Sequence, residues 1–252
     1  MIRHEQWAVG ERPSLDIGVP VGTVEVRTGD NGIIQLSLES AAAVDFEISH
    51  TGDRVSVRHP SRWSMRGRSC RLVVTAPAGT DVNVEAASAE VRLIGSLGAV
   101  RVRTASGDVQ IGGASRLEVV TASGEVSAGD VMGDATITTI SGGCTLTTVG
   151  GRMDATLTSG DLRVGSCTGD VSTTTTSGSI RVSDCGGSDI VMRSISGDVR
   201  LGLPSGIRVD ADISTISGRA QLPQAAAATG ERRPVRLKLK TVSGDIRIER
   251  SN

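Results

Sequence analysis

Short runs of alternating apolar and polar residues return at a regular interval along most of this chain. In the run 117–128, Leu117, Val119 and Thr121 alternate onto one face, and Val126 and Ala128 resume that face after a glycine. The same offsets recur elsewhere, as Val100, Val102, Val109 and Ile111, as Ile190, Met192, Val199 and Leu201, and as Leu237, Leu239, Ile246 and Ile248. Alternation with a period of two predicts β-strands, so each repeat is predicted to contain two short strands joined by a glycine corner.

The tripeptide Ser-Gly-Asp, or a close variant of it, marks this corner in each repeat. Its serines are Ser88, Ser106, Ser123, Ser141, Ser159, Ser177, Ser196, Ser217 and Ser243, with spacings between 17 and 26 residues. Apolar columns that persist at a fixed period indicate parallel stacking of each strand on its counterpart one repeat earlier. The prediction is an all-β fold, a single parallel β-solenoid with rungs of about 18 residues and two short strands per rung.

The prediction extends to domain organisation. Residues 81–252 are assigned to the regular solenoid, and residues 1–80 to degenerate N-terminal rungs or a cap continuous with it. Terminal repeats of stacked-repeat proteins are normally atypical, which accounts for the weaker pattern at the start. One structural domain is therefore expected.

Each residue of the corner motif is expected to have its own structural role. The serines from Ser106 to Ser243 fall on the inward register, where stacked hydroxyls can bond along a column or to corner amides. Glycine permits the positive φ of the corner. The acids face outward beside arginines, as in the pairs Asp161 and Arg163, Asp198 and Arg200, and Asp245 and Arg247.

Composition limits the classes of partner and the location. The 252 residues carry a formal net charge of -1, which gives no global attraction to nucleic acid or to an anionic membrane. One Phe, two Trp and no Tyr imply an aliphatic core. The first residues lack the apolar run of a signal peptide, and no stretch reaches the length of a membrane span. The expected location is cytoplasmic, without a membrane partner.

The four cysteines, Cys70, Cys144, Cys167 and Cys185, do not point to a metal. They form no CxxC pair and have no nearby histidine, so a zinc site is not expected. Cys167 and Cys185 are one repeat apart and are predicted to stack at about 4.8 Å, within reach of a disulfide. The favoured interpretation is that two small apolar residues fill one column.

Catalytic and calcium-binding chemistry fits the pattern poorly. The histidines, His4, His50 and His59, lie outside the regular repeats, so the recurring serines have no base in their own repeat. Gly143, Ser179 and Arg219 interrupt the acidic column that a calcium-binding roll requires. We therefore expect a protein that is not an enzyme and has no cofactor.

Two interruptions of the repeat are candidate interaction sites. Residues 58–71 contain no acid and include Arg58, Arg62, Trp63, Arg66, Arg68 and Arg71, and residues 223–234 include Arg232 and Arg233. An arginine-rich loop with one tryptophan can bind an acidic partner or a phosphate, with nucleic acid the less favoured choice. The alternative is a solvated loop between two strands.

The run Thr104-Ala105-Ser106-Gly107-Asp108-Val109 and its echoes at 121–126 and 241–246 resemble the repeats of a known bacterial family. This is the putative-adhesin family of β-strand-repeat proteins, a domain of unknown function, and the segment 73–82 is similar to the one that enters its repeats. The resemblance covers most of the chain. It implies a β-solenoid with no established catalytic residues.

The leading hypothesis is a non-enzymatic scaffold or binding module for a protein partner or for a second copy of the chain. The sequence ends a few residues after its last apolar pair, so a bare last rung is expected to permit end-to-end association, with Arg247 and Glu249 as contacts. Two alternatives are an adhesin that binds a surface or polymer, and a polysaccharide-active β-helix enzyme.

Overall fold

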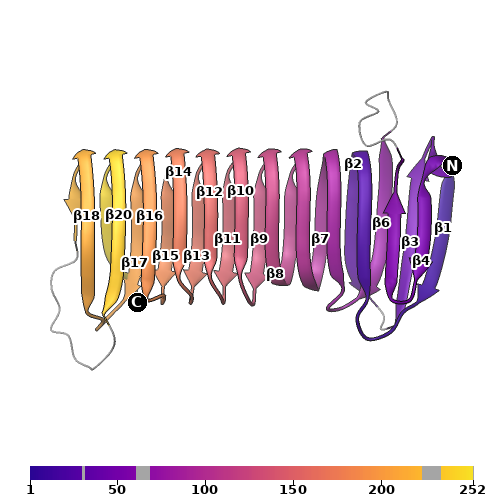
Figure 1. The fold of residues 1–252 in the computed structure, drawn as a ribbon, viewed down its shortest axis with the longest axis horizontal. Coiled ribbons are helices and arrows are strands. Elements are labelled where there is room, and N and C mark those ends of the chain that lie inside the picture. The colour runs from indigo at the N-terminus through magenta and orange to yellow at the C-terminus, as the bar shows by residue number, and fades with distance from the viewer. Residues whose placement is uncertain (30–31, 61–68, 223–233, 252) are drawn as a thin grey trace. The chain divides into compact units, whose positions relative to one another are not determined.

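The structure, a computed structural model, describes residues 1–29, 32–60, 69–222 and 234–251 and consists almost entirely of β-strands (Figure 1). The chain divides into two compact units, Met1–Gly129 and Asp130–Asn252. The only helical element of the described residues is a 3-10 turn, η1 (Ala43–Asp45). The division falls within β9 (Val126–Val131). The sequence-based assignment of one structural domain, divided at residues 80 and 81, stays a prediction.

Unit 2 is a stack of rungs in which each rung contributes one strand to each of two parallel strand rows. In stack order the first strand row contains β10 (Ala135–Ser141), β12 (Met153–Ser159), β14 (Val171–Ser177), β16 (Asp189–Ser196), β20 (Val235–Ser243) and β18 (Val209–Ser217). The second strand row contains β11 (Cys144–Val149), β13 (Leu162–Cys167), β15 (Ile180–Cys185), β17 (Val199–Pro204), β21 (Ile246–Ser251) and β19 (Ala220–Gln221). The predicted parallel β-solenoid with two short strands per rung is confirmed.

The core of unit 2 consists of columns of aliphatic side chains from alternate strand positions. Ile190, Met192 and Val199 are fully buried, whereas Val191 and Arg193 on the alternate positions are partly or fully exposed. The register aligns Met192 with Leu239, so equivalent side chains lie one above the other. Burial of apolar surface is the main stabilising term here.

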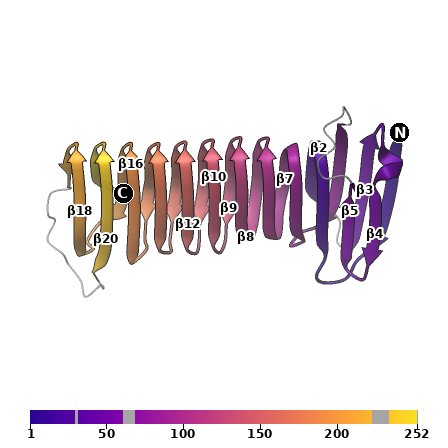
Figure 2. The same cartoon turned by 45° about the horizontal axis from the view of Figure 1, so that its top comes forward.

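The last two rungs stack in the reverse of their order in the sequence. β20 pairs in parallel with both β16 and β18, and β21 pairs with both β17 and β19 (Figures 1 and 2). The C-terminal rung therefore lies inside the stack, and the rung of β18 and β19 forms its end. The expectation of a bare C-terminal rung is wrong.

The reversal has a physical reason in the inward residues of the two rungs. The interior rung contributes Leu237 and Ile246 to the columns that the end rung continues with Ala211 and Ala220. Leu237 and Ile246 are each 1% exposed, while Ala211 and Ala220 are open to solvent. Placing the more apolar rung inside removes more apolar surface from water and leaves the weaker rung as a cap.

Close backbone approach requires glycine at the corner of each rung. Gly178 has a φ of 144°, and a Cβ at this position would lie 2.0 Å from the carbonyl oxygen of Gly160 in the rung below. Any larger residue would push the two rungs apart. The predicted role of the corner glycines is confirmed.

The predicted inward position of the serine ladder is wrong. Ser106 is half-buried, and Ser123, Ser141, Ser159, Ser177, Ser196, Ser217 and Ser243 are exposed. The serines do stack in register, but each is the last residue of its strand, where the chain has already left the core. Within the described residues, one hydroxyl–hydroxyl hydrogen bond joins two motif serines, from Ser106 Oγ to Ser88 Oγ at 3.0 Å.

In some rungs a buried threonine hydroxyl two residues earlier performs the role expected of the serines, whereas the buried hydroxyls of Thr139 and Thr175 make no hydrogen bond within the described residues. Thr104 Oγ1 donates to the carbonyl of Ser106 at 2.8 Å, and Thr241 Oγ1 donates to that of Gly197 at 3.2 Å. The motif serines bond to the corner through their backbone. The Ser196 carbonyl, for example, accepts the N–H of Gly178 at 2.9 Å. Backbone bonds between rungs thus hold the corner.

Unit 1 combines parallel rungs with antiparallel pairs. β2 (Ser14–Gly29), β7 (Asp81–Ser106) and β8 (Val109–Ser123) pair in parallel. Antiparallel pairing joins β1 (Ile2–Ala8) to β3 (Ile33–Ser40), β3 to β6 (Cys70–Pro77), and β4 (Glu47–Thr51) to β5 (Arg54–Arg58). The first part of the chain therefore departs from the purely parallel pairing of unit 2.

The rung order predicts unequal effects for two matched core truncations. Leu239→Ala removes a fully buried side chain from an interior rung and should lower the free energy of unfolding by about 3 kcal/mol. Ile213, the register partner of Leu239, is half-exposed in the end rung. Ile213→Ala should therefore lower the free energy of unfolding by only about 1 kcal/mol. Urea unfolding of both variants measures the difference. A larger loss for Ile213→Ala would contradict the reversed order.

Candidate ligand-binding groove

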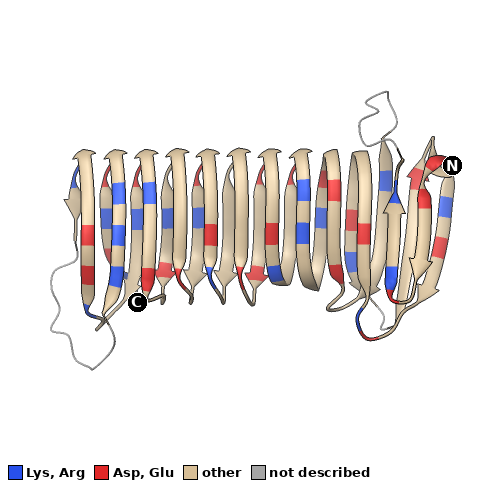
Figure 3. Cartoon of the chain, viewed as in Figure 1, with Lys and Arg blue, Asp and Glu red and all other residues tan. Residues whose placement is uncertain are grey.

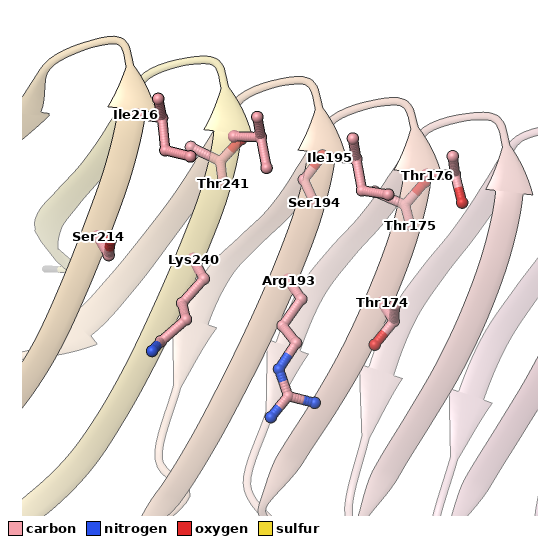
Figure 4. Close-up of a pocket in the computed structure, with 11 residues that line it drawn as sticks. Thr174, Thr175, Thr176, Arg193, Ser194, Ile195, Ser214, Ile216, Lys240 and Thr241 are labelled. Atoms are coloured by element: carbon pink, nitrogen blue, oxygen red, sulfur yellow. The ribbon is translucent and has the colours of Figure 1, made fainter.

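A groove of about 360 Å³ crosses four adjacent strands of the first strand row in unit 2 (Figure 4). Its lining contains two lines of outward side chains that run across the strands. The first, here called the polar line, consists of Thr174, Arg193, Lys240 and Ser214, and the second, the apolar line, consists of Thr176, Ile195, Val242 and Ile216. The groove thus places cationic and hydroxyl groups beside apolar side chains.

Strand alternation gives both lines their outward direction. Thr175, Ser194 and Thr241 lie between them and are buried, so the residues on either side of each must face the solvent. The apolar line is unusually exposed for large side chains, at 80% for Ile216 and 54% for Ile195. Contiguous exposed apolar side chains beside polar groups are typical of interaction surfaces.

The charges on this face are distributed unevenly along the strands. Outward cations follow β20 at Arg236, Lys238 and Lys240 (Figure 3). Arg236 has Asp189 and Asp210 as register partners, whereas Lys240 has Arg193 and Ser214. Acidic residues therefore flank Arg236 at the start of the strand. Lys240, at the groove, has no acidic register partner.

The two cations of the polar line lie on neighbouring strands, and only one of them has an acidic partner. Lys240 Nζ is 3.4 Å from Asp212 Oδ2, while Arg193 takes part in no ion pair within the part of the chain that the structure describes. Side chains on paired strands are separated by about 4.8 Å, and like charges directly opposite each other repel. An anion in the groove would relieve this repulsion.

Arg58, one of the sequence-predicted interaction residues, lies in a partly exposed ion-pair network of unit 1 that is centred on the buried Asp16. Its guanidinium donates to both oxygens of Asp16 at 2.6 and 2.7 Å and lies 3.8 Å from Glu85. Asp16 is only 6% exposed and also accepts from Arg54 at 2.9 Å and Asn83 at 3.0 Å. These contacts assign Arg58 a structural role in holding β5 against β2.

The Asp16 network shifts the pKa of its carboxyl group. Burial by itself raises the pKa of Asp16, but the hydrogen bonds from Arg58, Asn83 and Arg54 outweigh burial and hold it below the ordinary value. The ionised form is therefore the stabilised one.

The remaining predicted interaction residues are not gathered into one site. Arg71 is exposed on β6, opposite Glu39 of β3. Arg62, Trp63, Arg66, Arg68, Arg232 and Arg233 lie outside the described residues. Arg247 belongs to the interior rung, and its Nε donates to Gln221 of the end rung at 2.9 Å, so its assignment as an end contact is wrong. Glu249 pairs with Gly202 of β17, and its assignment stays a prediction.

The groove was not identified from the sequence, although a signal was present. The outward threonine column through Thr156 and Thr174 changes to Arg193 and Lys240 in the next two rungs of the stack. Two positions later, Thr176 is followed by Ile195 and Val242 in the same order. A simultaneous change in two outward columns is the pattern that marks this site.

Other reactive side chains do not form a catalytic or metal site in the described ranges. His50 stacks on Trp7 with ring centroids 6.0 Å apart, and His59 makes an edge contact with Phe46 at 5.0 Å. No group of three or more metal-ligating side chains occurs among these residues. None of the described helical segments has the length and apolar character needed to cross a membrane.

The cysteines are buried free thiols. Burial raises the pKa of Cys70 to about 11 and that of Cys144 to about 12, so both thiols stay protonated at neutral pH. Cys167 and Cys185 are register partners on β13 and β15, as the period predicted.

The fold and its outward lines define a protein of the parallel β-solenoid class. The profile of the Toastrack DUF4097 family matches residues 14–249, and the chain belongs to this family. No curated protein sequence matches the chain. The family relationship confirms the predicted resemblance.

Solved structures similar to this chain come from several bacteria. A Bacteroides fragilis protein described as a "putative adhesin" has 11% identity and a TM-score of 0.50, over 100% of this chain and 97% of that one. A Parabacteroides distasonis "putative adhesin" has 10% identity and a TM-score of 0.38, over 100% and 97%. A "putative lipid binding protein" from the same species has 9% identity and a TM-score of 0.38, over 100% and 97%. At these identities the similarity concerns the fold alone.

The Asp16 network predicts a pH-dependent loss of stability in acid. Asp16 contributes fully above about pH 4, the ordinary pKa of aspartate, and its contribution is lost as pH falls through the lower pKa of the folded state. Asp16→Asn leaves Arg58 without its main partner and should lower the free energy of unfolding at pH 7 by about 1–2 kcal/mol, because both arginines of the network stay in contact with solvent. Urea unfolding at pH 7 and pH 3 should show a smaller acid loss for this variant.

Asp154→Asn provides the control because Asp154 forms an exposed pair with Arg152. It should change stability little at either pH. An Asp16→Asn variant as stable as the native chain at pH 7 would contradict the structural role of the network.

Proposed function

We propose that this chain is a non-enzymatic β-solenoid scaffold that binds a partner protein through the groove of unit 2. The observation that carries the proposal is the joint change of two outward columns, which brings Arg193 and Lys240 beside Ile195, Val242 and Ile216. Packing of the rung does not explain this change, because outward side chains do not enter the core.

The chemistry of the groove favours an acidic segment with neighbouring apolar side chains. A carboxylate placed between Arg193 and Lys240 would form charge-assisted hydrogen bonds. An adjacent apolar side chain would cover Ile195 and Val242, which are 54% and 44% exposed. The volume of about 360 Å³ suits a few side chains of a partner.

The proposal that the chain is not an enzyme rests on the structural roles of its serines and histidines. The motif serines stack at the corners, and His50 and His59 lie against aromatic rings in unit 1. A cytoplasmic location accompanies the proposal, based on the composition of the sequence.

Peptide binding tests the proposed groove. A fluorescent peptide that alternates Asp and Leu should bind the full chain, and the double variant Arg193→Gln/Lys240→Gln should weaken binding at least about tenfold through loss of two charge-assisted contacts. Fluorescence anisotropy measures both affinities. A peptide that alternates Lys and Leu should not bind.

Arg236→Gln is the matched control, since Arg236 is exposed on the same strand but lies outside the groove lining. Its affinity for the acidic peptide should stay within about twofold of the native value, as for a distant surface change. An equal loss in this control would show general charge attraction and would contradict a defined site.

Self-association is a second candidate function, favoured by the edge strand β18. Among the described strands, β18 pairs only with β20, which leaves one edge of its backbone without a strand partner. Unpaired strand edges are templates for pairing with another chain. A second copy that pairs with β18 would also cover Ile213, which is half-exposed.

Sedimentation velocity over a range of concentrations tests this association. The native chain should form dimers, and Ile213→Lys should abolish them because an inward-pointing charge protects an edge strand from pairing. Arg247→Gln/Glu249→Gln should leave the dimers unchanged, because both residues belong to the interior rung. A native chain that stays monomeric at every concentration would exclude this function.

A further inference from the structure

The second strand row of unit 2 has one outward arginine at the same position in four successive rungs. These residues, here called the arginine ladder, are Arg163 on β13, Arg181 on β15, Arg200 on β17 and Arg247 on β21, and each is the register partner of the next. Figure 3 shows blue bands on successive strands of the stack. The ladder lies on different strands from the groove.

Stacking places these guanidinium groups close together and leaves them accessible. Neighbouring rungs are about 4.8 Å apart, a spacing at which like charges directly opposite each other destabilise a sheet. The side chains of Arg163, Arg200 and Arg247 are 58%, 46% and 43% exposed, and Arg181 is also exposed. A ligand can therefore reach all four.

Nearby acids compensate the ladder only in part. Asp161 lies 2.7 Å from Arg163, but its other oxygen accepts the backbone N–H of Ser179. The Asp198 contact to Arg200 is longer, at 3.6 Å, and Glu249 is 3.9 Å from Arg247. These three arginines thus each have one acid within 4 Å.

Arg181 is the least compensated member of the arginine ladder. Ser179 occupies the position that holds Asp161 and Asp198 in the neighbouring rungs, so the acid that accompanies the other arginines is missing here. Within the described residues Arg181 has no ion pair, and its register partners on both sides are arginines. Positive charge is therefore concentrated at the middle of the ladder.

A linear phosphate polymer has the chemistry that fits this arrangement. Guanidinium groups form paired hydrogen bonds with phosphate oxygens, and a line of them matches a chain of anionic groups along the stack. Residues 130–252 contain no aromatic side chain on which a nucleic acid base could stack. We propose that the arginine ladder binds inorganic polyphosphate, centred on Arg181.

Binding of short-chain inorganic polyphosphate to the full chain tests this site by isothermal titration calorimetry. Arg181→Gln should weaken binding about tenfold, and Arg163→Gln/Arg181→Gln/Arg200→Gln should abolish it, because each removes charge-assisted bonds. Arg181→Lys keeps the charge without the paired donors and should lie between the native chain and Arg181→Gln. Thermal unfolding followed by circular dichroism establishes that each variant is folded.

The groove variant Arg193→Gln/Lys240→Gln removes two cations from the other strand row and should bind polyphosphate as the native chain does. An equal loss in this variant, or native affinity in the triple variant, would overturn the site. Tighter binding of oligodeoxythymidylate of equal charge would overturn the assignment to polyphosphate. The acidic peptide remains a separate test of the groove, so the two proposals can fail independently.

Discussion

In-register hydrogen bonding between successive rungs is the constraint on which unit 2 depends. Each strand pairs with strands from other rungs, so a residue in one rung limits the size of the side chain at its register partner. The corner shows the constraint most clearly, because a Cβ on Gly197 would lie 2.1 Å from the Gly178 carbonyl oxygen. The sequence repeat is the consequence of this geometry, since every rung must fit the one beside it.

The same constraint separates structural from functional positions. Inward columns must stay aliphatic and corners must stay glycine, while outward columns can vary without disturbing the stack. The two proposed binding surfaces occupy such outward columns, one on each strand row. They differ in chemistry, because the groove combines cations with exposed isoleucines, whereas the arginine ladder is a row of partly compensated guanidinium groups.

Much of the fold could be predicted from the sequence because the information is local. Alternation of apolar residues about the corner glycines determines the strands, and the constant spacing determines the parallel register. The prediction that the motif serines face inward was wrong because it extended strict alternation past the point where the strand leaves the core. Thr241 is buried, whereas Ser243 is exposed. The alternation rule holds only while the strand lies on the core.

The order of the last two rungs could not be predicted from spacing. Ser196 and Ser217 both align with Ser243, so the corner motif allows the last two rungs of the sequence to stack in either order. What distinguishes them is the apolar content of the inward positions, where Leu237 and Leu239 face Ala211 and Ile213. The same error affected the candidate end contact Arg247, which was assigned from chain order alone.

Amide hydrogen exchange on the intact chain is the most direct measurement of the rung order. The account predicts slow exchange for β20, whose backbone is paired on both sides, and faster exchange for β18 at the edge of the stack. Faster exchange in β20 than in β18 would place the C-terminal rung at the end and would contradict the account.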